Sequence, residues 1–107
     1  MGPETDRSLP PGDAAPPPGT ARRVVKICNQ RGLHARAAAR FVKTAGQFDA
    51  EIQVRKNGTA VSGRSIMGLM MLAAASGTLI ELTATGREAE SAVATLARLI
   101  ECKFDED

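Results

Sequence analysis

The chain has 107 residues, a formal net charge of +2 and two cysteines, which fits one small domain. No stretch approaches the roughly 18 apolar residues of a membrane span, and the start lacks the basic and apolar regions of a secretory signal. We therefore expect a cytoplasmic protein without membrane insertion, in which two cysteines lacking metal-ligand spacing stay reduced.

Residues 1–20 have the composition of a disordered tail. They hold all six prolines of the chain and almost no bulky apolar side chains. Such a segment buries too little surface to offset the entropy of ordering. We therefore expect a disordered Pro/Gly-rich tail at residues 1–20 and one folded domain at residues 21–107.

The folded part begins with a predicted strand and a predicted helix. Residues 21–28 favour a strand, because Val25 and Ile27 alternate with Lys26 and Cys28. Apolar side chains then recur at the helical spacing i, i+3, i+4 and i+7, which predicts a short amphipathic helix over about 34–45. These side chains are Ala38, Phe41, Val42 and Ala45.

A hairpin follows. Residues 51–55 alternate between polar and apolar side chains, so this second strand should have one buried and one exposed face. Asn57 and Gly58 supply the two-residue turn, and a short third strand is predicted over 59–62.

A second, short helix is predicted within residues 63–72, with Ser65 at or near its N-cap. Its apolar side chains are Ile66, Met67, Leu69, Met70, Met71 and Leu72. These are too many for one buried stripe, so some should be exposed, and exposed methionines suit docking to several partners. Burial of all six in the core is the equally weighted alternative.

A fourth strand over 79–84 and a long final helix complete the pattern. Thr85 and Glu88 have the spacing of a capping box at the start of this helix. The apolar stripe of the helix consists of Ala89, Ala92, Val93, Leu96, Leu99 and Ile100. The acidic residues 105–107 are expected to fray.

The predicted order βαββαβα indicates an α+β fold. Its helices are long enough to cover only one face of a four-stranded sheet. We therefore expect an open-faced β-sandwich, a four-stranded antiparallel sheet covered on one face by three helices.

The only histidine, His34, lies where the first predicted helix begins. Backbone N–H groups without intrahelical partners and the positive end of the helix dipole stabilise an anion there. The same field disfavours imidazolium, so we expect a neutral ring with one nitrogen free as a nucleophile. Arg36 can bind phosphate oxygens through its planar guanidinium. The hypothesis is a histidine that accepts and donates a phosphoryl group; a purely structural role at the helix end is the alternative.

The charge distribution favours an anionic partner. Between residues 14 and 48 there are seven basic residues and no acidic one. The basic residues near the histidine are Arg31, Arg36, Arg40 and Lys43. Their positive field should attract phosphate or an acidic protein surface. Nucleic acid is disfavoured, because a chain without Trp or Tyr offers little for base stacking.

Two segments carry a family resemblance. They are Gly32-Leu33-His34-Ala35-Arg36 and, about thirty residues later, Ser65-Ile66-Met67-Gly68-Leu69-Met70. Together they resemble HPr, the histidine-containing phosphocarrier of the bacterial phosphoenolpyruvate-dependent phosphotransferase system, over about residues 22–104. The chain departs from the family pattern at Ala37, where a proline is usual, and at Arg31, where a small or amide residue is common.

The resemblance implies a relay in which phosphorylated Enzyme I passes a phosphoryl group to HPr, which passes it to a IIA protein. His34 matches the histidine that carries the group on Nδ1, and Arg36 matches the arginine that stabilises it. Ser65 matches the serine that HPr kinase/phosphorylase modifies in many members. Docking to partners is expected at Ile66, Met67, Met70, Arg31 and Arg40.

A carrier of this kind is a stoichiometric substrate of other enzymes and not an enzyme itself, and we expect no cofactor, no metal and a monomer. The competing hypothesis is a regulatory binding module, in which phosphorylated Ser65 controls docking to a transcription factor or metabolic enzyme. The alanine-rich residues 37–39 resemble the nitrogen-linked branch of the system more than the sugar-uptake branch.

Overall fold

The computed structural model describes residues 19–106. The predicted tail at residues 1–20 therefore lies outside the described residues, except for its last two positions. Asp107 also lies outside them. The elements in chain order are β1 (Thr20–Lys26), α1 (Ala35–Ala45), β2 (Glu51–Lys56), β3 (Thr59–Ser62), α2 (Ile66–Met71), β4 (Leu79–Thr85), α3 (Ala89–Glu101) and a 3-10 helix η3 (Lys103–Asp105). The predicted order βαββαβα is confirmed, with η3 added at the end.

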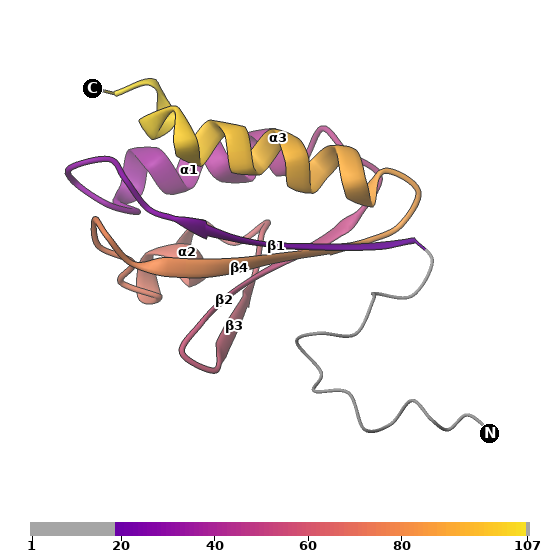
Figure 1. The fold of residues 1–107 in the computed structure, drawn as a ribbon, viewed down its shortest axis with the longest axis horizontal. Coiled ribbons are helices and arrows are strands. Elements are labelled where there is room, and N and C mark those ends of the chain that lie inside the picture. Colours follow the sequence, from indigo (N-terminus) through magenta and orange to yellow (C-terminus); the bar gives the residue numbers. More distant parts are fainter. Residues whose placement is uncertain (1–18, 107) are drawn as a thin grey trace.

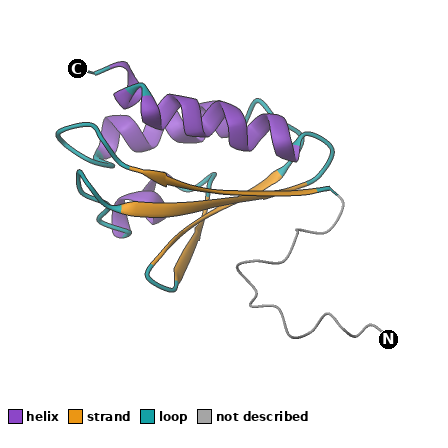
Figure 2. Ribbon diagram, viewed as in Figure 1, coloured by secondary structure: helices purple, strands orange, loops and turns teal. Residues whose placement is uncertain are grey.

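The four strands form one antiparallel sheet in the order β1-β4-β2-β3. Helices α1 and α3 lie side by side across one face of this sheet, and α2 packs against α1 and β3 (Figure 1). Figure 2 shows the two long helices, α1 and α3, as a layer above the twisted sheet. The open-faced sandwich predicted from the sequence is therefore confirmed.

The core lies between the sheet and the helices. Burial alternates along β2, where Ile52 and Val54 are buried and their neighbours are largely exposed, because successive side chains of a strand point to opposite faces. Helix α1 buries Ala38 and Phe41 of the predicted stripe, but Val42 is only half-buried.

The predicted capping box at the start of α3 is wrong. Thr85 is still part of β4, where it pairs with Thr20, so it cannot serve as the N-cap. The N-cap is Glu88, whose side chain makes no capping hydrogen bond. Its carboxylate instead accepts a hydrogen bond of 2.7 Å from the backbone N–H of Asp49, and its own N–H donates to the Asp49 carbonyl. Pairing of Thr85 within the sheet overrides the local sequence signal.

The expected fraying of the C-terminal residues is also wrong for positions 105 and 106. Lys103, Phe104 and Asp105 have positive φ angles of 58°, 54° and 61°, and the Phe104 side chain is buried in the core. Left-handed backbone is unfavourable for each such residue by about 1 kcal/mol or more. Contacts between this turn and the rest of the domain must therefore stabilise it. They direct residues 103–106, which we name the C-terminal strap, back toward α1.

Candidate functional site

His34 is the N-cap of α1. Its backbone is extended, and its ring Nδ1 accepts a hydrogen bond of 3.3 Å from the backbone N–H of Arg36, in the first turn. A nitrogen that accepts this bond carries a lone pair and no proton. Of the two ring nitrogens, Nδ1 is therefore the one with a free lone pair, and it lies at the positive end of the helix dipole.

The turn that carries His34 is packed tightly against the loop after α2. Gly32 has a φ angle of +69°, and a Cβ added there would lie 2.6 Å from the carbonyl oxygen of Ala74. The N–H of the next residue, Leu33, donates a 2.9 Å hydrogen bond to that same oxygen. Only glycine satisfies both the positive φ and the close backbone approach.

The other ring nitrogen of His34, Nε2, contacts the carboxylate of Glu106 through Oε2. The second carboxylate oxygen, Oε1, accepts a 3.1 Å hydrogen bond from the side-chain amide of Asn29, which is fully buried. The same amide group donates to the carbonyl of Gly32 at 2.8 Å. Burial raises the pKa of Glu106, but the hydrogen bonds from Asn29 and His34, together with neighbouring positive charge, outweigh it and hold that pKa below its usual range.

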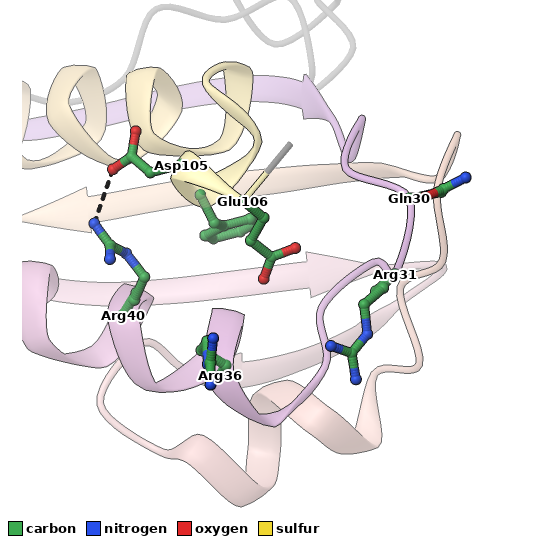
Figure 3. A pocket seen from close by; sticks show the side chains of 7 residues that line it. Gln30, Arg31, Arg36, Arg40, Asp105 and Glu106 are labelled. Atoms are coloured by element: carbon green, nitrogen blue, oxygen red, sulfur yellow. Dashed lines mark hydrogen bonds and ion pairs between the residues drawn. The ribbon is translucent and has the colours of Figure 1, made fainter.

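A polar pocket of about 320 Å³ lies between α1 and the C-terminal strap. It is lined by Gln30, Arg31, Arg36, Arg40, Phe104, Asp105 and Glu106. Figure 3 shows the three arginines around this space, with the 2.8 Å ion pair between Arg40 and Asp105. The structure thus brings Arg31, Arg36 and Arg40 together. It also places two carboxylates among them, which the sequence analysis did not foresee.

Ser65 caps the second helix as predicted, because its Oγ accepts a 2.9 Å hydrogen bond from the N–H of Gly68. The sequence left open whether all six apolar side chains of the second helix are buried, and the structure shows that they are not. Leu69 and Leu72 are buried, and the remaining apolar side chains of this segment are exposed: Ile66, Met67, Met70 and Met71. The loop after α2 lines a shallow pocket together with His34, so α2 and the histidine belong to neighbouring parts of the surface.

Sequence reasoning missed Asn29 and Glu106. Their contact with each other spans 77 positions, and Glu106 meets His34 across 72. One signal was present: Phe104 follows Ile100 at i+4, so the apolar stripe of α3 continues past the end of the predicted helix. A buried Phe104 indicates that the acidic residues beside it are held against the domain.

The fold and the site define a class of protein, a small α+β domain with a histidine at a helix N-terminus beside a pocket lined by arginines. The family model described as the "PTS HPr component phosphorylation site" matches residues 21–102. The phosphocarrier protein HPr of Neisseria meningitidis serogroup A is 49% identical over 85 residues, which cover 79% of this chain and 96% of that protein.

Two further comparisons agree. The phosphocarrier protein NPr of Shewanella violacea is 42% identical over 84 residues, covering 78% of this chain and 92% of that protein. The crystal structure of HPr-C-His from Thermoanaerobacter tengcongensis matches with a TM-score of 0.78 and 42% identity, over 81% of this chain and 98% of that one. The chain belongs to the HPr family of phosphocarrier proteins of the phosphotransferase system.

Residues 19–106 contain neither a candidate membrane span nor a cluster of metal-ligating side chains. No helix in this part of the chain is long and apolar enough to cross a membrane. The same residues contain no group of three or more His, Cys, Asp or Glu side chains placed to hold a metal ion.

Proposed function

We propose that this chain is a stoichiometric phosphoryl carrier in which His34 accepts the group on Nδ1 from phosphorylated Enzyme I and donates it to a IIA protein. One observation carries the proposal: Nδ1 accepts a hydrogen bond from the backbone N–H of Arg36 at the N-terminus of α1, so its lone pair is directed there. An anionic group bound to Nδ1 would lie where the helix dipole and the unpaired N–H groups stabilise it.

The transfer needs little from this chain beyond positioning. As the Nδ1 lone pair forms the new P–N bond, the P–N bond to the donor histidine breaks and that histidine leaves with the electron pair. The phosphoryl oxygens then replace Nδ1 as acceptors for the N–H of Arg36. The Arg36 side chain lines the adjacent pocket and supplies the positive charge that a phosphoryl group requires.

Docking to Enzyme I and IIA proteins is proposed at the exposed side chains of α2 together with basic residues around His34. The apolar members are Ile66, Met67 and Met70, and the basic members are Arg31 and Arg40. Exposed methionines adapt to differently shaped partners. Arg40 forms an ion pair with Asp105 in the free protein. Because an exposed ion pair contributes little free energy, breaking it on docking would cost little.

Ser65 is the proposed site for HPr kinase/phosphorylase. Ser65 is a partly exposed residue at the N-cap of α2. Phosphorylation would add about −1.5 to −2 charge there, which the first turn tolerates while the docking surface becomes more negative. We expect weaker exchange with Enzyme I as a result. The exposed Met67 and Met71, on the helix that this serine caps, favour the second candidate function, a regulatory module that docks a transcription factor or metabolic enzyme.

Incubation with Enzyme I, Mg²⁺ and phosphoenolpyruvate tests the carrier role. Intact mass should show an acid-labile gain of one phosphate in the wild type and none in His34→Ala. A Ser65→Ala variant is the matched control and should still accept phosphate. No gain in the wild type would refute the carrier role and shift the proposal to Ser65. Size-exclusion chromatography of the same sample tests the proposed monomer.

A further inference from the structure

The C-terminal strap brings a carboxylate to the side of the His34 ring opposite the proposed phosphorylation site. Glu106 contacts Nε2, whereas the phosphoryl group is proposed to bind Nδ1. The side chains of both residues are largely shielded from solvent, with 16% of His34 and 15% of Glu106 exposed. The phosphoryl transfer proposed above does not explain why a carboxylate contacts Nε2.

The two ring contacts together select one tautomer of the neutral imidazole. Nδ1 accepts from the N–H of Arg36, so it cannot carry the proton. The proton therefore resides on Nε2, which donates it to the Glu106 carboxylate. A carboxylate that orients a histidine in this way keeps the correct nitrogen available for reaction.

We propose that Glu106 is a positioning residue, which holds His34 in the Nε2–H tautomer and balances the positive charge that the ring acquires when Nδ1 is phosphorylated. This inference rests on the proposed phosphorylation of His34. A neutral imidazole that forms a P–N bond through Nδ1 and keeps its Nε2 proton becomes a phosphoimidazolium. The proton stays on Nε2, and the adjacent carboxylate offsets the new ring charge.

The surrounding contacts keep the carboxylate charged and in place. Asn29 donates to Glu106 Oε1 at 3.1 Å, and its own position is set by its bond to the Gly32 carbonyl. The buried Phe104 ring and the ion pair between Asp105 and Arg40 hold the two preceding residues of the strap. These contacts are not those of a side chain that frays in solvent.

The test separates the two tasks of the carboxylate with two variants. Glu106→Ala removes the acceptor for Nε2–H, whereas Glu106→Gln keeps an acceptor oxygen and removes the charge. Glu101→Gln is the matched control, because Glu101 is an exposed carboxylate on α3 whose 3.8 Å pair with Arg23 lies outside the contacts of His34. Thermal unfolding of all four proteins checks that each variant folds.

The first readout is the ¹⁵N spectrum of the His34 ring in the unphosphorylated protein, which does not depend on Enzyme I. The wild type, Glu106→Gln and Glu101→Gln should show a predominant Nε2–H tautomer. Glu106→Ala keeps the contact between Nδ1 and the N–H of Arg36 but loses the acceptor for Nε2–H, so its Nε2–H fraction should be lower than in the wild type. An Nδ1–H tautomer in the wild type, or an unchanged spectrum in Glu106→Ala, would overturn the inference.

The second readout is the equilibrium of phosphoryl exchange with Enzyme I. The phosphorylated fraction relative to the unphosphorylated one should fall about fivefold or more in Glu106→Gln, the effect of one charge pair at ~4 Å in water-like surroundings. Glu101→Gln should match the wild type. Equal equilibria in Glu106→Gln and Glu101→Gln would refute the charge-balancing task. If Enzyme I phosphorylates none of the four proteins, the proposed function is refuted, and the charge-balancing task is refuted with it. The tautomer spectrum still tests the positioning task in that case.

Discussion

Replacing Gly32 by alanine tests how the turn before His34 is built. The new residue would have to keep a φ angle of +69°, which is unfavourable for alanine by about 1 kcal/mol. Its Cβ would also lie 2.6 Å from the Ala74 carbonyl oxygen, a backbone atom that cannot turn away. Forced repacking of this kind adds about 1 to 3 kcal/mol. We therefore expect Gly32→Ala to lower the free energy of unfolding by about 2 to 4 kcal/mol.

The matched control is Gly58→Ala in the β2–β3 hairpin. Gly58 also has a positive φ angle, +84°, but nothing lies within 4 Å of an added Cβ. This variant should lose only the backbone contribution of about 1 kcal/mol. Urea unfolding of both variants and the wild type measures the difference. A Gly32→Ala protein no less stable than Gly58→Ala would refute the close packing of the His34 turn against the loop after α2.

Three further predictions concern the strap, the second helix and pH. Phe104→Ala should destabilise the domain by about 3 to 5 kcal/mol in urea unfolding, since it empties a fully buried site, and an effect under 1 kcal/mol would contradict the anchoring of the strap. Ser65→Ala should lose about 1 kcal/mol with its N-cap bond, whereas Ser65→Asp keeps a capping oxygen, stays close to wild-type stability and exchanges phosphate with Enzyme I more slowly. Asn29, His34 and Arg31 lower the folded pKa of Glu106 below the reference of 4.5. The stabilisation that the Glu106 carboxylate provides is therefore complete above that reference, and it is lost as the pH falls through the folded pKa. Unfolding curves of the wild type and Glu106→Gln should therefore converge on acidification, and a constant gap would contradict this linkage.

The sequence predicted the elements whose signals are local. Period-2 alternation located β2, and the adjacent Asn57 and Gly58 located the hairpin turn, because both patterns involve only residues that are neighbours along the chain. Local evidence also placed Ser65 at or near the N-cap of the second helix and His34 at the start of the first, where the structure makes His34 the N-cap.

The sequence did not predict features that depend on distant partners. Thr85 had the spacing of a capping residue, but its pairing with Thr20 across the sheet keeps it in β4. The acidic composition of the C-terminus suggested fraying, whereas Glu106 meets His34 across 72 positions and Asp105 meets Arg40 across 65. No local pattern specifies such pairs, so the carboxylate of the site became visible only in the structure.

The most direct test of the account is the position of the phosphoryl group on the histidine. The protein labelled with ¹⁵N in its single histidine should be phosphorylated by Enzyme I and phosphoenolpyruvate and analysed for coupling between ³¹P and each ring nitrogen. We predict a direct bond between phosphorus and Nδ1 of His34, with the proton retained on Nε2. Phosphorus bound to Nε2, or phosphate on any other residue, would contradict the account.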